Sequence, residues 1–169
     1  MKKYVLGIII LFASLALFAQ NPKGFDVMCN GYIEGTVPLS TPKQVNRMME
    51  ASEVTLLDAR ETNEYNISHI KGALKVGYDK FDLASVKELD KLKPVYVYCS
   101  IGYRSEKIGE KLQKAGFKKV YNIYGGIFNW ANSGYLLVDS QGKLTTKVHG
   151  YNDDWSKWIN SQKCTKVVN

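Results

Sequence analysis

The residues best suited to chemistry stand together in a short stretch, CSIGYRS, which runs from Cys99 to Ser105. The preceding VYVY alternates β-branched and aromatic residues, as a buried strand does, and the following SEKIGEKLQKAGF is typical of a helix. Gly102 permits the tight turn that must join the two. Such a turn points backbone N–H groups inward, and the helix adds the positive end of its dipole, so a thiol at its centre is held as a thiolate. We therefore expect Cys99 to act as a nucleophile.

A buried core cysteine is the alternative interpretation of Cys99, because free cysteines are among the most buried residue types. The spacing of Gly102, Arg104 and Ser105 around a turn that leads into a helix favours the functional interpretation. Asp58 also ends an apolar segment, VTLLD. In an open α/β sheet, ligands bind beyond the carboxyl ends of the strands, so we expect Asp58 and Cys99 at the same functional edge.

Short apolar segments alternate with helical ones along most of the chain, and these elements must position the thiol. We expect strands at 54–59, 73–76, 95–99, 119–125 and 135–139, helices at 42–51, 82–92, 105–117 and 127–134, and a helical turn over 61–69. Thr41, Pro42 and Gln44 carry the signature of a helix start. Because the strands are nearly all apolar, the sequence predicts an α/β fold with a central parallel sheet flanked by helices on both faces.

Four segments resemble, in order and spacing, the rhodanese-like sulfurtransferases, and in particular the single-domain thiosulfate sulfurtransferases. They are LLDAR, EYNISHIKGA, VYVYCSIGYRS and KLQKAGFKKVYNIYGGIFNW. The resemblance implies a three-layer rhodanese-like domain. It also implies that Cys99 takes a sulfane sulfur from thiosulfate or a persulfide, becomes a persulfide, and passes the outer sulfur on, with no cofactor. The implied partners are a small anionic sulfur donor and a thiol or protein sulfur acceptor.

The same resemblance assigns roles to individual residues around the thiol. The loop amides would cradle the persulfide, and the loop consists of Ser100, Ile101, Gly102, Tyr103, Arg104 and Ser105. The Arg104 side chain would hold an anionic donor or stabilise the loop. Asp58 and Arg60 would pair and brace the loop, and His69 would be structural. Ser100 stands where many thiosulfate-using members have a basic residue, and Ser68 replaces the usual glycine.

Two alternatives to a turning-over sulfurtransferase remain at this point. Four residues separate Cys99 from Arg104, one fewer than in phosphatases built on the same fold, so the loop favours sulfur over a phosphate oxyanion. The other alternative is a rhodanese-like persulfide carrier or redox-sensing binding module with little turnover. An activated thiol outside the cytoplasm is prone to oxidation, which keeps this second interpretation open.

We expect four parts in the chain. They are a signal peptide at 1–19, an irregular N-terminal arm at 20–38, a rhodanese-like domain at 39–138, as the resemblance implies, and a C-terminal extension at 139–169 that packs on the domain. Residues 1–19 show a basic start, an apolar run and a small residue at the end, as secretory signals do. An uncleaved membrane anchor is the alternative. We expect export to the periplasm or the medium and no stable membrane insertion after cleavage.

The net charge and the positions of the histidines and cysteines bear on nucleic-acid binding, metal binding and disulfide formation. The formal net charge of +7 falls by two when Lys2 and Lys3 leave with the signal, and the other lysines are scattered, so we expect no nucleic-acid binding. Two histidines and three dispersed cysteines show no metal-ligand spacing. An odd cysteine count in an oxidising compartment leaves one thiol over. Cys29 and Cys164 could form a disulfide, which would leave Cys99 free.

Overall fold

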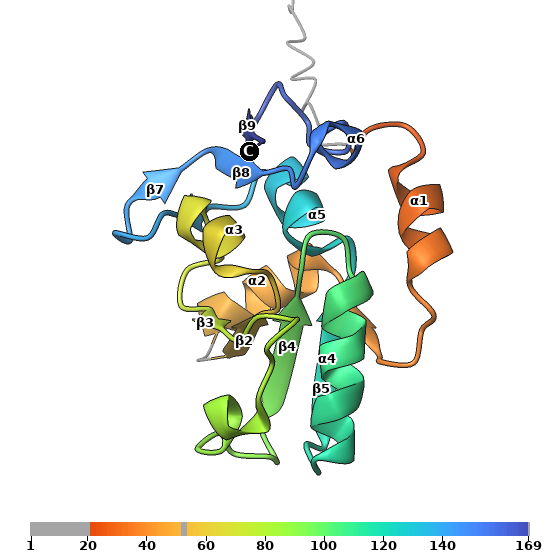
Figure 1. Ribbon diagram of the computed structural model, residues 1–169, viewed down its shortest axis with the longest axis vertical. Coiled ribbons are helices and arrows are strands. Elements are labelled where there is room, and N and C mark those ends of the chain that lie inside the picture. Colours follow the sequence, from red (N-terminus) through yellow and green to blue (C-terminus); the bar gives the residue numbers. More distant parts are fainter. Residues whose placement is uncertain (1–20, 52–53, 169) are drawn as a thin grey trace, which may run out of the picture.

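A five-stranded parallel sheet forms the centre of the computed structural model, which describes residues 21–51 and 54–168. The strand order is β1-β5-β4-β2-β3, and every neighbouring pair is parallel. The strands are β1 Leu39–Ser40, β2 Thr55–Asp58, β3 Leu74–Lys75, β4 Pro94–Tyr98 and β5 Lys119–Ile123. Figure 1 shows β4 in the middle of the molecule with helices around it. The predicted α/β architecture is confirmed.

The sheet is buried on both faces, because successive side chains of a strand point to opposite sides. On β4, Tyr96 and Tyr98 belong to one apolar cluster, whereas Val95 and Val97 belong to a second. Cys99 continues the second series. The thiol is therefore set on the face that the helix after the loop covers.

Helices cover each face by burying one side. Helix α4, Tyr103–Lys114, packs Ile108 and Leu112 into the cluster that holds Cys99. Helices α2, Pro42–Ala51, and α5, Gly126–Asn132, contribute Val45 and Phe128 to the opposite cluster. Thr41 and Gln44 make the expected reciprocal hydrogen bonds at the start of α2. The short helix α3, Thr62–Ile67, replaces the predicted helical turn.

The N-terminal arm is not irregular, which corrects the expectation for residues 20–38. Residues Phe25–Tyr32 form helix α1, and Phe25 and Cys29 on its inner side are buried. The apolar pattern is weak in this segment, because Val27 and Tyr32 are exposed and blur the apolar stripe. The arm then runs into β1, which pairs with β5 at the edge of the sheet.

The amphipathic helix expected over 82–92 is also wrong. Only a 3₁₀ turn, η1 Leu83–Val86, forms there. The Asp82 carboxylate accepts the Ala84 N–H, and the Asp90 carboxylate accepts the Leu92 N–H. Such local side-chain bonds compete with helix formation. Val86 is buried, but Leu83 and Leu92 face solvent.

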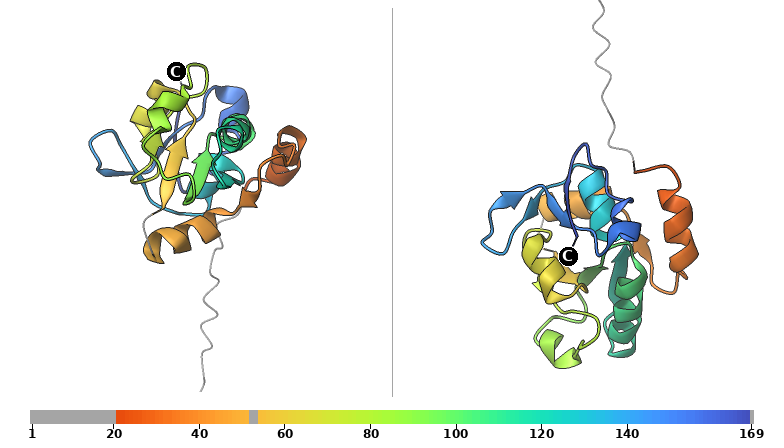
Figure 2. Two further views of the ribbon diagram at one scale, coloured as in Figure 1. Left: turned by 90° about the horizontal axis from the view of Figure 1, so that it is seen from below. Right: turned by 45° about the horizontal axis from the view of Figure 1, so that its top comes forward.

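The C-terminal segment adds two small ribbons and one helical turn. Strand β6 Leu137–Val138 pairs antiparallel with β7 Leu144–Thr145, and β8 Lys147–His149 pairs parallel with β9 Thr165–Val167. Between β8 and β9 lies α6, Asp153–Ser156. Ile159 and Cys164 are buried in the cluster that contains α5, and Trp155 and Trp158 pack against it. Figure 2 shows this segment above the start of α4 and next to α1.

The segment expected to be a secretory signal, 1–19, lies outside the described residues. Within 21–51 and 54–168, no helix combines the length and the apolar character needed to cross a bilayer.

Candidate active site

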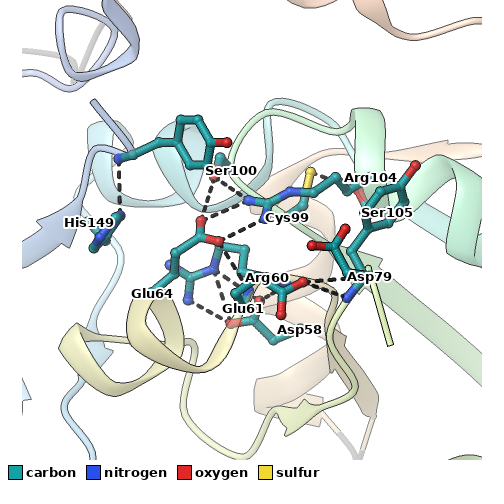
Figure 3. Close-up of polar contacts among 12 residues, drawn as sticks. Asp58, Arg60, Glu61, Glu64, Asp79, Cys99, Ser100, Arg104, Ser105 and His149 are labelled. Carbon is teal, nitrogen blue, oxygen red and sulfur yellow. Dashed lines mark hydrogen bonds and ion pairs between the residues drawn. The ribbon is translucent and has the colours of Figure 1, made fainter. Parts of the chain in front are cut away.

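Cys99 lies directly after β4, at the carboxyl edge of the sheet. Its side chain is buried and forms part of the wall of a cavity of about 540 Å³. The backbone N–H of Gly102 donates to Cys99 Sγ at 3.2 Å. The Ser105 hydroxyl lies 3.5 Å from the same sulfur. Its one hydrogen has a better acceptor in Asn122 Oδ1 at 2.7 Å, so the Gly102 N–H is the main donor to the sulfur. Figure 3 shows Cys99 close to Ser105 and Arg104.

The loop after Cys99 is fixed in shape by its neighbours. Gly102 has φ of +119° and precedes the first residue of α4, a backbone conformation that favours glycine. Asn122 on β5 donates from Nδ2 to the Gly102 carbonyl at 2.9 Å. Since Asn122 also accepts from Ser105, one buried amide ties both the loop and the first turn of α4 to the sheet.

The start of α5 supports the loop from behind. The N–H of Ile127 donates to the Cys99 carbonyl at 2.8 Å, and that of Phe128 donates to the Ser100 carbonyl at 3.2 Å. A Cβ at Gly126 would lie 2.3 Å from the Cys99 carbonyl oxygen. Only glycine allows the two backbones to approach this closely, and Gly126 is therefore part of the support of the Cys99 loop.

Arg104 is held by a carboxylate from α3. Its guanidinium binds Glu64 through two hydrogen bonds of 2.7 Å, and it donates to the Ser100 hydroxyl at 3.0 Å. Burial alone would raise the pKa of Glu64, but the hydrogen bonds and charge of Arg104, with the charge of Arg60, hold it below its usual value. Burial opposes the charge of Arg104, but Glu64 and Cys99 raise its pKa. Arg104 therefore acts as a positioning residue whose charge is largely neutralised (Figure 3).

Glu64 is a site residue that the sequence analysis did not single out. It is 1% exposed, and its neighbours along α3 are polar, so the sequence alone gave no sign that this carboxylate turns inward. A capping bond from the Glu61 N–H to Glu64 Oε2 at 3.0 Å fixes it further.

The other expected residues lie behind the site. Arg60 and Asp58 form a buried ion pair at 2.6 Å, and Arg60 also donates to the Ser68 carbonyl at 2.7 Å. His69 stacks on Tyr65 at a centroid distance of 3.8 Å, with Nδ1 3.1 Å from the Tyr65 carbonyl. None of these three lines the cavity around Cys99. They hold β2 and α3 in place, and Glu64 depends on that placement.

Cys29 and Cys164 are not joined by a disulfide in the structure. Both are free, buried thiols. Among residues 21–51 and 54–168, no group of three His, Cys, Asp or Glu side chains is arranged to bind a metal ion.

The wall of the cavity is largely aromatic. From the loop and its neighbourhood come Tyr103 and Tyr78, and from more distant parts of the chain come Tyr32, Tyr151 and Trp155. The last three lie outside the strand–loop–helix pattern that predicts the thiol, so no local motif could have assigned them to the site. Trp155 packs against the apolar cluster that contains α5 and also faces the cavity.

His149 joins the same end of the molecule from β8. Its ring is 2% exposed, Nδ1 accepts the Tyr151 N–H at 3.0 Å, and Nε2 has no hydrogen-bond partner. Burial lowers the pKa of His149 below its usual value. The neutral imidazole therefore orders the backbone that carries Tyr151 to the cavity.

Comparisons with known proteins agree with this geometry. The family model "Rhodanese-like domain" matches residues 41–133. The tRNA uridine(34) hydroxylase of Pelagibacter ubique is 34% identical over 96 residues, which cover 53% of this chain and 30% of that protein. The chain thus spans under a third of this relative's length.

Solved structures give the same family. The rhodanese-like domain of an Anabaena protein matches with a TM-score of 0.56 and 27% identity, over 60% of this chain and 79% of that one. A thiosulfate sulfurtransferase from Pseudomonas aeruginosa, at 24% identity, shares the fold with a TM-score of 0.58, over 70% of this chain and 23% of that one. Because the family model covers more than half of the chain, this protein belongs to the family with a rhodanese-like domain.

Proposed function

We propose that this protein is a sulfurtransferase that carries a sulfane sulfur on Cys99. The Cys99 thiolate attacks the outer sulfur of thiosulfate or a persulfide, and the bond between that sulfur and the rest of the donor breaks. The donor leaves with the bonding electron pair, as sulfite or a thiolate. An acceptor thiolate, or cyanide in an assay, then attacks the outer sulfur of the Cys99 persulfide and regenerates the thiolate.

The observation that carries this proposal is the placement of the sulfur. Cys99 Sγ lies against a cavity and accepts the Gly102 N–H. Charge-assisted hydrogen bonds from N–H groups stabilise anions, and the first amides of a helix have no acceptor within the helix. The start of α4 at Tyr103 can therefore stabilise both the thiolate and the persulfide anion.

Arg104 has a supporting role in this proposal. Its guanidinium is committed to Glu64 and Ser100, so it shapes the loop without offering an unpaired fork to the donor. Of the two roles expected for Arg104, these contacts support loop stabilisation over binding of an anionic donor.

The intact mass of the protein, measured before and after incubation with thiosulfate or a low-molecular-weight persulfide, tests the proposal. We expect one added sulfur on the wild type, its removal by cyanide with release of thiocyanate, and no adduct on Cys99→Ser. Repeated turnover supports an enzyme, whereas a single loading without turnover supports the persulfide-carrier alternative. Failure of a reduced wild-type protein to load with either donor would overturn both.

We also propose that the protein works outside the cytoplasm, in the periplasm or the medium. The support is the sequence of residues 1–19, with its basic start and apolar run. Fractionation of cells that produce the full chain tests this, with N-terminal sequencing of the product. Recovery of the uncleaved chain in the cytoplasm would contradict it.

A further inference from the structure

The cavity over Cys99 extends beyond the part of the chain that defines the family. The family match covers residues 41–133, but Tyr32 comes from α1 and Tyr151 and Trp155 come from the C-terminal segment. The rings of Tyr32 and Trp155 meet edge to face at a centroid distance of 5.3 Å. Two additions at opposite ends of the chain therefore build one wall over the thiol.

This wall is anchored to the rest of the fold. Asn132 on α5 donates from Nδ2 to Asn21 Oδ1 and to the Trp158 carbonyl, each at 2.9 Å. Phe25 and Trp158 pack edge to face at 6.3 Å. Figure 2 shows α6 above the start of α4, with α1 to its side. Because buried contacts link the two additions, the wall is part of the folded structure.

The size and lining of the cavity suit an organic group. At about 540 Å³, it falls within the range of pockets that bind organic ligands, which are typically lined by aromatic side chains with a few polar groups. An inorganic anion would leave most of these aromatic surfaces without contact.

The charges of the cavity disfavour a dianion. Arg104 is the single cation among the described residues that line it, and Glu64 neutralises that charge at 2.7 Å. The other charged groups of the lining are the carboxylates of Glu61 and Asp79. Lys107, farther along α4, is paired with Glu34 and Glu110.

We propose that the sulfur donor of this site is an organic sulfane compound with a flat, apolar or aromatic group and at most one negative charge. The inference rests on the proposed function of Cys99. With an arylthiosulfonate, for example, the thiolate attacks the terminal sulfur, the sulfur–sulfur bond breaks, and the arylsulfinate leaves with the electron pair. The ring of the donor lies between Trp155 and the tyrosines during this step.

Three donors with related chemistry test the proposal: benzenethiosulfonate, methanethiosulfonate and thiosulfate. The rate of Cys99 persulfide formation is measured for each and divided by the rate of its reaction with a small free thiol. We expect the normalised rate with the aryl donor to exceed that with the methyl donor about tenfold, as stacking on aromatic rings provides. Thiosulfate is expected to be the slowest of the three.

Variants connect this preference to the wall. Trp155→Leu keeps an apolar side chain but removes the ring, and we expect it to bring the aryl-to-methyl ratio close to one. Tyr32→Leu, on the other side of the wall, should lower the ratio as well. Tyr121→Leu is the matched control, because Tyr121 stacks on Tyr96 on the other face of the sheet, outside the cavity lining, and it should keep the wild-type ratio. Equal normalised rates in the wild type, or an equal loss of preference in Trp155→Leu and Tyr121→Leu, would overturn the inference.

A binding measurement separates this inference from the proposed function. Calorimetry on Cys99→Ser compares benzenesulfonate with methanesulfonate, neither of which can react. Stronger binding of the aryl compound, weakened about tenfold by adding Trp155→Leu, supports the pocket even if no donor loads Cys99, a result that would overturn the proposed function alone. Loading by all three donors with equal binding of both sulfonates would leave the proposed function standing and remove this inference.

Discussion

Cys99 and the pair Cys29 and Cys164 are all buried, free thiols, yet their surroundings differ in every respect that matters for chemistry. Cys99 accepts a backbone N–H and lies against a cavity at the start of a twelve-residue helix. Cys29 and Cys164 lie within the apolar cluster on the other face of the sheet.

Burial alone therefore does not decide the reactivity of a thiol. Burial, with smaller contributions from Asp26 and Cys99, raises the pKa of Cys29 to about 12. Burial also raises the pKa of Cys164, against the opposing charge of Lys163. In the described part of the chain, no N–H group donates to the sulfur of Cys29 or Cys164, whereas the Gly102 N–H donates to Cys99 Sγ. The nucleophile is thus selected by the backbone around it.

The largest effect should come from removing the selected thiol. Cys99→Ser should lower the rate of thiocyanate formation from an organic thiosulfonate and cyanide on the order of a thousandfold or more, because no other group can hold the transferred sulfur. Cys29→Ala and Cys164→Ala serve as matched controls and should keep the wild-type rate. A rate in Cys99→Ser close to that of the controls would invalidate the comparison.

The next largest effect, a loss of fold stability, should come from Gly126, where α5 packs behind the Cys99 loop. Gly126→Ala should destabilise the fold by about 4 kcal/mol, since it combines left-handed backbone strain with a collision with the Cys99 and Ser100 backbone. Gly142→Ala has similar strain, at φ of +75°, but open space around it, and should cost about 1 kcal/mol. Denaturant unfolding of both variants measures the difference. Equal losses would show that the close approach of α5 to the loop is not required.

Loss of the Glu64 charge, which pairs with Arg104, should lower the stability of the fold by a smaller amount. Glu64→Gln leaves the guanidinium of Arg104 without its counter-charge in a largely buried place, which should lower the free energy of unfolding by about 3 kcal/mol. Glu88→Gln removes a carboxylate from an exposed pair with Lys87 and should have no measurable effect. Unfolding curves at neutral pH provide the measurement. A Glu64→Gln protein as stable as Glu88→Gln would contradict the assignment of Glu64 as the anchor of the loop.

The smallest expected effect is the pH dependence that Cys29 contributes. Its folded-state pKa of about 12 lies above the ordinary value of 9.0, so the unfolded chain ionises first. The stabilisation is complete below pH 9 and is lost as the pH rises from 9 towards 12. At pH 10, Cys29 should lower the free energy of unfolding by about 1 kcal/mol. The difference between wild type and Cys29→Ala, followed from pH 8 to pH 10.5, isolates this contribution, and a constant difference would show that Cys29 is not buried in the way described.

The strand–loop–helix unit around Cys99 could be predicted from the sequence because the patterns that indicate it are local. Apolar runs of a few residues mark β4 and β5, and the apolar spacing of Ile108 and Leu112 marks α4. The same signals fail where local and tertiary preferences conflict. Residues 82–92 carry apolar residues at helical spacing, yet the Asp82 and Asp90 carboxylates satisfy nearby backbone N–H groups in turns.

The residues that surround the thiol were harder to predict from the sequence, because they come from parts of the chain that are far apart. Glu64 and Arg104 are separated by forty positions, and no periodicity records that they meet. Tyr32 and Trp155 reach one wall from opposite ends of the chain. Local pattern thus locates the nucleophile, whereas the groups that position it and shape its substrate become visible only in three dimensions.

The most direct test of the comparison is to map where the sulfur goes. After brief exposure of the reduced protein to a sulfane donor, trapping of persulfides with an alkylating agent and peptide mass analysis would assign the added sulfur to individual cysteines. We expect a persulfide on Cys99, with Cys29 and Cys164 unmodified. A persulfide on Cys29 or Cys164, with Cys99 reduced and free, would contradict it.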